Sequence, residues 1–289
     1  RHRGSRLVDG TAGCAKVLTC PYHAWSYARD GRLVGVPHRH EYPGLQTEKL
    51  GLHAVPLEEW RGFLFVTLEP GAPSVAEMMA PYEDEVAPYR FEELRAIGRV
   101  TLRARPLNWK TIADNYSDHL HIPVGHPGLT RLFGRNYRIE ARDHVDRMEG
   151  DLVEKISDNP SERAYQRLLP EVDHLPRTHR RKWLYYKLFP NVAFDIYPDQ
   201  VDFMQFLPVS ATETVIREIS YALPDNRREM KAARYLNWMI NRRVNAEDTE
   251  LITRVQLGMQ SPTYKAGPLG TSEVCLRSFS KKLRKLIPE

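Results

Sequence analysis

Short apolar or β-branched runs, separated by turns that contain glycine or proline, make up the first part of the chain. The runs are residues 17–19, 33–36 and 62–68, a pattern typical of strands. The dipeptide Asp30-Gly31 between residues 25–27 and 32–34 predicts a β-hairpin. Residues 1–70 are therefore expected to form a small all-β domain.

A second domain is predicted for residues 71–289. Residues 70–73 (PGAP) mark the boundary, and the spacing of Ser74 and Glu77 predicts a capping box at the start of a helix. An alternating strand at residues 99–105 leads to Asn108, a good N-cap for a helix. Residues 128–180 are polar and dotted with proline, and we expect entrance loops or a variable connection there.

Residues 182–223 contain four β-rich runs (KWLYYKLF, VAFDIYP, VDFMQFLPVS and TVIREISYAL) separated by turn residues. An antiparallel meander of this length needs a helix to cover one face. One helix is expected to begin at Asn226, and Asn245 is expected to cap a further helix that carries Asp248. The predicted fold class is α+β.

Length and charge limit the range of functions. A chain of 289 residues can form two moderate domains, and a net charge of +5 is too small and too dispersed to favour nucleic-acid binding. The basic run at residues 281–285 is expected to be a solvated helix face, or else a docking site for an acidic electron donor. No apolar run is long enough to span a bilayer.

The three cysteines cannot make a disulfide framework. Beyond Cys20, discussed below, Cys14 and Cys275 are expected to be inert thiols in a reducing cytoplasm.

The segment 108–127 (NWKTIADNYSDHLHIPVGHP) is the first candidate for chemistry. On a continuous helix, Asp114, Asp118 and His121 would share one face. Pro123 would end the helix, so His126 would return on a loop toward the same point. This arrangement predicts a metal site, whereas the alternative is an ordinary amphipathic helix.

Asp248 is a third potential ligand for that site. It shares a helical face with apolar residues, whereas Glu247, Glu250 and Arg254 occupy a different face. The apolar residues of its face are Leu251, Ile252, Val255 and Met259. A buried carboxylate needs compensation, which either a metal or the N-terminus of the helix would supply.

Near the start of the chain, Cys20 and His23 form a C-x-x-H turn, and His2 lies in an HRG sequence. Histidine and cysteine pairs on two loops hold a Rieske [2Fe–2S] cluster. The pattern resembles C-x-H, a spacer and C-x-x-H, with the first cysteine expected directly before Arg1. Because Cys14 is poorly placed to replace it, we expect the sequence to be an N-terminal truncation that holds no cluster by itself.

Together these motifs resemble the catalytic α subunit of Rieske non-haem iron oxygenases, the family of aromatic-ring-hydroxylating dioxygenases and demethylases. The resemblance implies a Rieske domain followed by a helix-grip catalytic domain, in which an antiparallel sheet wraps a long C-terminal helix. It implies that His121, His126 and Asp248 bind a mononuclear Fe(II), and that His2, Cys20 and His23 bind the cluster.

The resemblance also gives Asp118 a catalytic role, linking His121 to His23 of a neighbouring subunit. It implies a head-to-tail homotrimer, with or without β subunits, that receives electrons from NAD(P)H through a separate reductase or ferredoxin. The expected reaction is mono- or dihydroxylation, or oxidative demethylation, of a small organic compound.

An aromatic substrate is favoured by the apolar side chains of the predicted sheet, although the same side chains suit a cage for a methylated ammonium group. These side chains are Phe194, Tyr197, Phe203, Met204 and Phe206. Two other functions stay open: a non-catalytic helix-grip ligand-binding protein, and a zinc-dependent hydrolase that uses His121, His126 and Asp248.

Overall fold

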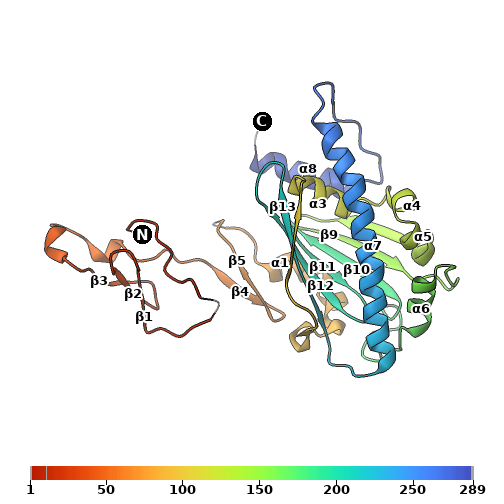
Figure 1. Cartoon of the computed structure of the whole chain (residues 1–289), viewed down its shortest axis with the longest axis horizontal. Coiled ribbons are helices and arrows are strands. Elements are labelled where there is room, and N and C mark those ends of the chain that lie inside the picture. The colour runs from red at the N-terminus through yellow and green to blue at the C-terminus, as the bar shows by residue number, and fades with distance from the viewer. Residues whose placement is uncertain (1, 11, 70, 288–289) are drawn as a thin grey trace. The chain divides into compact units, whose positions relative to one another are not determined.

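A computed structural model describes residues 2–10, 12–69 and 71–287 of the chain. The chain divides into two compact units, Arg1–Ala72 and Pro73–Glu289. Arg1 and Pro70, which bear on the sequence predictions above, lie outside the described residues. Figure 1 shows the elements of both units.

The smaller unit is built from short antiparallel strands, as predicted. A three-stranded sheet contains β1 (Val17–Thr19), β2 (Ser26–Ala28) and β3 (Leu33–Gly35), and a separate hairpin contains β4 (Leu57–Trp60) and β5 (Phe63–Val66). The hairpin at Asp30-Gly31 is confirmed, with Gly31 at a φ of 87°, which glycine adopts without strain. Two short 3₁₀ helices follow β3: η1 (Arg39–Glu41) and η2 (Thr47–Lys49).

The larger unit is organised around one antiparallel sheet with the strand order β6-β13-β12-β11-β10-β9-β8, and β7 also pairs with β13. The predicted meander is confirmed as its centre: β10 (Lys182–Leu188), β11 (Val192–Ile196), β12 (Val201–Pro208) and β13 (Thr214–Ala222). The outer strands are β6 (Arg95–Ala96), β7 (Thr101–Arg105), β8 (Tyr137–Ala141) and β9 (Val145–Asp151).

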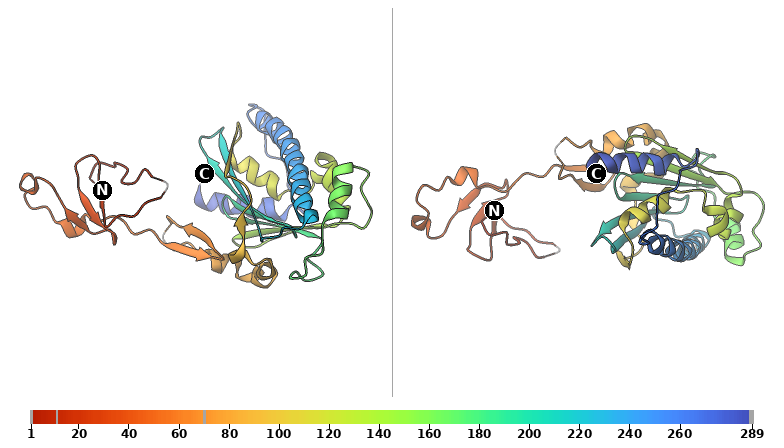
Figure 2. Two further views of the ribbon diagram at one scale, coloured as in Figure 1. Left: turned by 60° about the horizontal axis from the view of Figure 1, so that its bottom comes forward. Right: turned by 90° about the horizontal axis from the view of Figure 1, so that it is seen from above.

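Helices cover the sheet face that carries Tyr185, which we call the inner face. The long helix α7 (Arg228–Met259) crosses this face (Figures 1 and 2). The helix α3 (Trp109–Ser117) packs beside α7, and α8 (Val274–Leu286) packs against α3 and β8. The shorter helices α4 (Ile122–Gly125), α5 (Pro127–Phe133) and α6 (Pro160–Leu168) pack along α7. The α+β fold class and the sheet wrapped on a long helix are thus confirmed.

The opposite face of the sheet is tied to the segment before β6 by charged groups. Arg147 on β9 makes a bidentate ion pair with Glu85, and the Tyr186 hydroxyl donates to the same carboxylate. This segment contains α1 (Val75–Met79), η3 (Ala80–Tyr82), α2 (Glu83–Val86), η4 (Ala87–Tyr89) and η5 (Phe91–Glu93). The capping box of Ser74 and Glu77 at α1 is confirmed.

Two sequence predictions on helices and loops are wrong. Asn245 does not cap a new helix, because α7 is continuous and the Asn245 amide donates to the Asn241 carbonyl one turn earlier. Asp248 therefore lies deep in a long helix and not in a first turn. Residues 128–180 are not mainly loops, since they supply α5, β8, β9 and α6.

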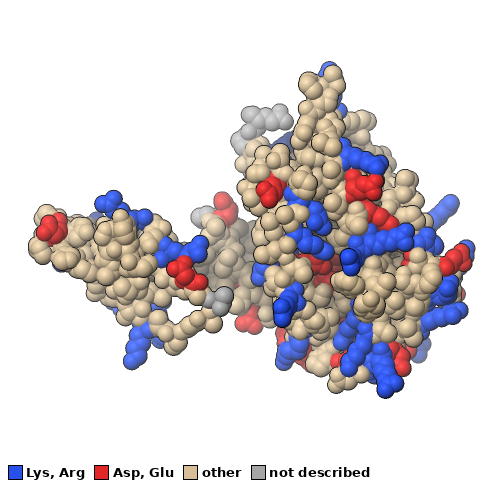
Figure 3. All heavy atoms as spheres, viewed as in Figure 1, with Lys and Arg blue, Asp and Glu red and all other residues tan. Residues whose placement is uncertain are grey.

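The surface shows no strong segregation of charge on the face that α7 crosses, where basic and acidic side chains are interspersed (Figure 3). The basic run near the C-terminus lies on α8, where Lys282 donates to the Arg142 carbonyl at 3.0 Å, so this lysine is not freely solvated. Among the described helices, none is long and apolar enough to cross a membrane.

Candidate metal centre and adjoining cavity

The helix α3 ends earlier than the sequence suggested. Asn108 caps it as predicted, accepting from the Lys110 N–H at 3.0 Å. The helix stops at Ser117 because Asp118 is extended (ψ 139°) and its carboxylate accepts from the backbone N–H groups of Leu120 and His121. Asp118 therefore turns the chain, and His121 lies after the helix instead of on its face.

His121 and His126 flank the single turn of α4 as its N-cap and C-cap residues. Gly125 allows α7 to approach this turn closely, because a Cβ at this position would lie 2.7 Å from a methyl carbon of Leu251 and 3.5 Å from the ring of His121. The backbone N–H of His126 donates to the Ile122 carbonyl at 2.9 Å. The turn thus delivers both imidazoles toward α7.

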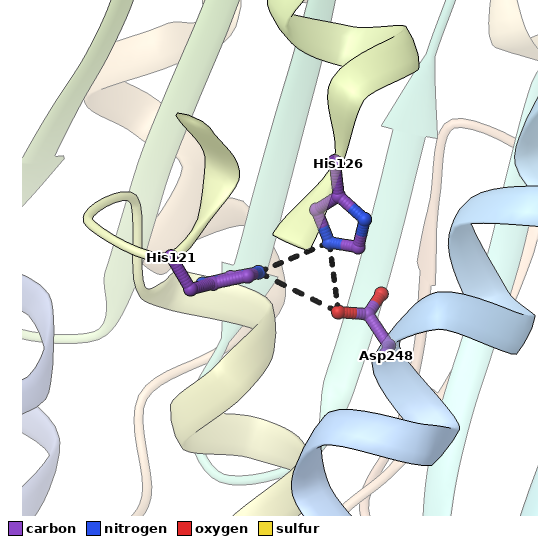
Figure 4. A group of neighbouring side chains, drawn as sticks. All are labelled: His121, His126 and Asp248. Atoms are coloured by element: carbon purple, nitrogen blue, oxygen red, sulfur yellow. Dashed lines mark hydrogen bonds and ion pairs between the residues drawn. The ribbon is translucent and has the colours of Figure 1, made fainter. Parts of the chain in front are cut away.

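The structure brings His121, His126 and Asp248 together (Figure 4). The two Nε2 atoms are 3.1 Å apart, and Asp248 Oδ1 lies 2.9 Å from His126 Nε2 and 3.5 Å from His121 Nε2. For metal–ligand bonds of about 2.1 Å, neighbouring ligands about 90° apart would be separated by roughly 3 Å. The triangle has the size that such a site requires.

Both imidazoles are oriented by a second carboxylate. Asp118 Oδ2 lies 2.8 Å from His121 Nδ1, and Glu247 Oε2 lies 2.9 Å from His126 Nδ1. Because a carboxylate only accepts, each Nδ1 carries a proton, so Nε2 is the ring atom that faces the centre of the triangle and can bind a metal once it is deprotonated. The prediction that Glu247 faces elsewhere is wrong, since its longer side chain reaches back to His126.

Asp248 is held on the third side. The Asn115 amide donates to Asp248 Oδ1 at 2.7 Å, so Asn115 holds this carboxylate in place. Asp114, one residue earlier on α3, is instead enclosed near Lys187, and burial raises its pKa to about 6. The remaining histidine of this segment, His119, is absent from the cluster of metal-binding groups among the described residues.

The pKa shifts of the three residues indicate that their triangle attracts positive charge. Burial opposes ionisation of Asp248, but hydrogen bonds from His121 and His126 outweigh it and lower its pKa to about 2. Burial likewise lowers the pKa of His121, but its bonds to Asp118 and Asp248 raise it to about 9. These shifts mean that positive charge is favoured at the centre of the triangle. A metal cation would replace the protons on the Nε2 atoms, and two imidazoles with one carboxylate suit Fe(II) as well as zinc.

A cavity of about 120 Å³ adjoins the three residues. Its other walls are the inner face of the sheet and α3, including Tyr116, Tyr137, Tyr185 and Asp195. Sequence reasoning missed these four, because only the three-dimensional fold shows which residues of separate elements meet. Of the five side chains expected to line a pocket, Met204 and Phe206 line this cavity.

The other three do not line it directly. Phe194 and Phe203 point to the opposite face of the sheet, where Phe194 packs against Phe91, because neighbouring residues of a strand alternate between faces. Tyr197 is buried and does not line the cavity, but its hydroxyl donates to Asp195, which does.

In the smaller unit, the three residues expected to bind the cluster lie close together. The rings of His2 and His23 have centroids 4.9 Å apart, and the buried Nδ1 of His2 has no hydrogen-bond partner among the described residues. Cys20 is buried, and hydrogen bonds from the backbone N–H groups of Tyr22 and His23 lower its pKa. An unpaired imidazole nitrogen and a stabilised thiolate fit a [2Fe–2S] cluster, whereas Cys14 is exposed.

Comparison with known families assigns both units. Residues 1–55 match the Rieske [2Fe-2S] domain, and residues 91–289 match the ring hydroxylating alpha subunit (catalytic domain). Among solved structures, a quaternary ammonium Rieske monooxygenase aligns with a TM-score of 0.71 at 20% identity, covering 99% of this chain and 75% of the other. Naphthalene 1,2-dioxygenase from a Rhodococcus species aligns with a TM-score of 0.69 at 19% identity, covering 99% of this chain and 79% of the other. The TM-scores show that this chain shares the fold of both structures.

Sequence relatives include oxygenase subunits of carnitine monooxygenases. The protein of Escherichia coli K12 is 36% identical over 131 residues, which are 45% of this chain and 35% of the relative. That of Acinetobacter baumannii is 26% identical over 269 residues, 91% of this chain and 68% of the relative. The match thus spans about a third of the Escherichia coli protein. The family match covers most of the chain, which therefore belongs to the ring hydroxylating alpha subunit family, with a Rieske [2Fe–2S] domain preceding the catalytic domain.

Proposed function

We propose that the chain is the oxygenase component of a Rieske monooxygenase that hydroxylates a quaternary ammonium compound. One C–H bond of the substrate is converted to C–OH while one O₂, two electrons and two protons are consumed and one water is released. Hydroxylation at a carbon bonded to nitrogen leads to cleavage of the C–N bond and gives an amine and an aldehyde.

The observation that carries this proposal is the triangle of His121, His126 and Asp248 at the edge of a cavity. The cofactors of this family are a Rieske cluster and a mononuclear iron. When bound, the iron activates O₂ and the cluster supplies electrons. His121, His126 and Asp248 would hold the iron, and His2, Cys20 and His23 would contribute ligands to the cluster.

Two carboxylates of the chain, those of Asp118 and Glu247, orient the histidines that would bind the metal. Asp118 and Glu247 each accept the Nδ1 proton of one histidine, which fixes the tautomer and aims both Nε2 lone pairs at the metal position. Asp118 is also the residue that would connect the iron ligand His121 to the cluster ligand His23 of a neighbouring subunit. This second role rests on the family resemblance.

A quaternary ammonium substrate is supported by two independent observations. Relatives named as carnitine, glycine betaine and choline monooxygenases match the chain. The cavity presents tyrosine rings from α3, β8 and β10, and aromatic faces attract ammonium groups that cannot donate hydrogen bonds. Of the two substrate classes that the sequence left open, the methylated ammonium compound is therefore preferred over an aromatic hydrocarbon.

The partners and assembly also belong to the proposal. The oxygenase would receive electrons from a separate reductase or ferredoxin that oxidises NAD(P)H, and it would function in the cytoplasm. A head-to-tail homotrimer would bring Asp118 of one subunit near His23 of the next. Sedimentation of the purified protein measures this state, and a monomer with full activity would contradict it.

The test combines metal analysis with turnover. The purified holoenzyme is incubated with reductase, NADH and carnitine, choline or glycine betaine, and substrate-dependent O₂ uptake and amine or aldehyde formation are measured. We expect uptake with at least one of these compounds and none with naphthalene. A zinc-dependent hydrolase would contain zinc and consume no O₂, and a ligand-binding protein would bind the compound without product.

A further inference from the structure

One acid in the wall of the cavity, Asp195, belongs neither to the metal triangle nor to the carboxylates that orient its histidines. Asp195 is on β11 and lines the same cavity as His121, His126 and Asp248. In the antiparallel register it stands directly opposite Tyr185 of β10 on one side and Asp202 of β12 on the other. Residues directly opposite in register point to the same face of a sheet, so Asp195 faces inward. It is only partly buried because the cavity leaves part of it accessible.

Asp195 is fixed by hydroxyl groups and not by a cation. The Tyr116 hydroxyl donates to Oδ1, and the Tyr197 hydroxyl donates to Oδ2 at 3.2 Å. Within the described ranges, no lysine, arginine or histidine forms an ion pair with this carboxylate. Each oxygen has one donor, so the carboxylate is held in place while its charge is left uncompensated.

Aromatic rings surround this acid. Tyr116 and Tyr185 have centroids 6.5 Å apart with their planes at 84°, and Tyr185 and Tyr197 have centroids 6.2 Å apart at 90°. Tyr137 packs against Tyr185 at 6.2 Å. Rings set at steep angles to one another present faces as well as edges toward the space between them, and ring faces attract cations.

A second acid strengthens the negative field. Asp202 is buried and accepts from the Gln200 amide at 2.9 Å. Burial raises the pKa of both Asp195 and Asp202 to about 7, and the charge of Asp202 contributes to the shift of Asp195. Arg103 offsets part of the shift of Asp202, whereas no cation is among the causes of the shift of Asp195.

We propose that Asp195 is the counter-charge for the ammonium group of the substrate and the residue that makes this cavity select cations over neutral molecules of the same shape. A quaternary ammonium group has a permanent charge and no N–H, so it is recognised by ring faces and a nearby carboxylate instead of by hydrogen bonds. A neutral substrate would not be attracted by Asp195, and its binding would bury the charge of the Asp195 carboxylate further without compensating it. This inference rests on the proposed function, because it concerns the same cavity and the same substrate class.

The experiment compares matched ligands with and without the charge. Choline and the methyl ester of glycine betaine, both cations, are each paired with the neutral analogue in which carbon replaces the ammonium nitrogen, leaving a tert-butyl group of nearly the same shape. Dissociation constants are measured by calorimetry on the holoenzyme at pH 8, above the pKa of about 7 to which burial raises Asp195. We expect wild type to bind at least one cation about 10-fold or more tightly than its neutral analogue, the scale of a close charge pair.

Asp195→Asn keeps the size of the side chain and removes its charge. In this variant we expect the cation to lose about 10-fold or more in affinity while the neutral analogue changes by less than about 3-fold. Asp195→Glu keeps the charge and should retain the preference for the cation. Asp199→Asn is the matched control: Asp199 is also a buried acid bonded to a tyrosine (Tyr165, 2.7 Å) but does not line this cavity.

The outcomes separate the two proposals. If wild type prefers cations and Asp195→Asn keeps that preference while remaining folded and iron-loaded, the role of Asp195 is overturned and the proposed function stands. An equal loss of cation affinity in Asp199→Asn would also overturn it. If wild type shows no preference for any cation over its neutral analogue, the proposed substrate class fails, and this inference fails with it.

Discussion

Removing the carboxylate of Glu247 should weaken metal binding without removing a ligand. Glu247 Oε2 lies 2.9 Å from Nδ1 of His126, whose side chain is 2% exposed. Without this acceptor, the buried Nδ1–H loses its partner and the imidazole loses the bond that fixes its orientation. Losing such a supporting carboxylate lowers metal affinity about 10- to 100-fold, which corresponds to about 1.4–2.8 kcal/mol.

The assay is an anaerobic titration of apoprotein with Fe(II) against a competing chelator, for wild type and Glu247→Ala. Glu250→Ala is the matched control, because Glu250 is an exposed acid two residues after Asp248 that forms an ion pair with the exposed Arg254. Since Glu247 also contacts Arg243 at 3.1 Å, Arg243→Ala reports what that ion pair contributes. Wild-type affinity in Glu247→Ala, or an equal loss in Glu250→Ala, would refute the reasoning.

Three further predictions follow from particular contacts. Asp118→Asn should keep both metal centres but nearly abolish single-turnover electron transfer, and near-normal transfer would make Asp118 a residue that only turns the chain. Gly150→Ala should lower the melting temperature by several degrees, because a Cβ there would lie 2.8 Å from the buried ring of Phe133 and overpacking costs about 1–3 kcal/mol; an unchanged melting temperature would show that the ring can shift freely. The pKa of Asp195 is raised from 3.8 to about 7, so the folded state binds a proton more tightly than the unfolded state and the resulting stability is lost as pH rises through about 7. Asp195→Asn should therefore become more stable relative to wild type between about pH 4 and pH 8 in thermal melts, and a constant difference would contradict the assignment.

The elements that the sequence predicted well are those specified by local chemistry. Ser74 with Glu77, Asn108 and the Asp30-Gly31 turn each act through their immediate neighbours, and all three are observed as expected. The strands of the central meander also follow directly from their apolar pattern.

The sequence did not predict the strands β8 and β9, because charged residues that form ion pairs mask the alternation of apolar and polar positions. On β9, Arg147 and Glu149 occupy the face opposite the cavity, where they pair with Glu85 and Lys182 from distant parts of the chain. From the sequence alone, charged residues such as Arg147 and Glu149 are typical of a loop, because their ion-pair partners are distant in the sequence. The long range of these contacts explains why residues 128–180 could not be assigned.

The candidate site was predicted in part. Spacing alone was enough to select His121 and His126, but it could not show that the helix ends at Ser117, because the turn depends on the carboxylate of Asp118 bonding to the following N–H groups. A helical projection also placed Glu247 away from the site, since it treats every side chain as equally short. The acid in the cavity wall, Asp195, required the register of three strands.

Iron stoichiometry is the most direct test of the central claim that His121, His126 and Asp248 hold a mononuclear iron. Iron and acid-labile sulfide are measured in the purified full-length holoenzyme of wild type and of Asp248→Ala, with Glu250→Ala as control. The account predicts that Asp248→Ala loses one iron per chain while its sulfide content stays at the wild-type level. Full retention of iron in Asp248→Ala, or loss of the same iron in Glu250→Ala, would contradict it.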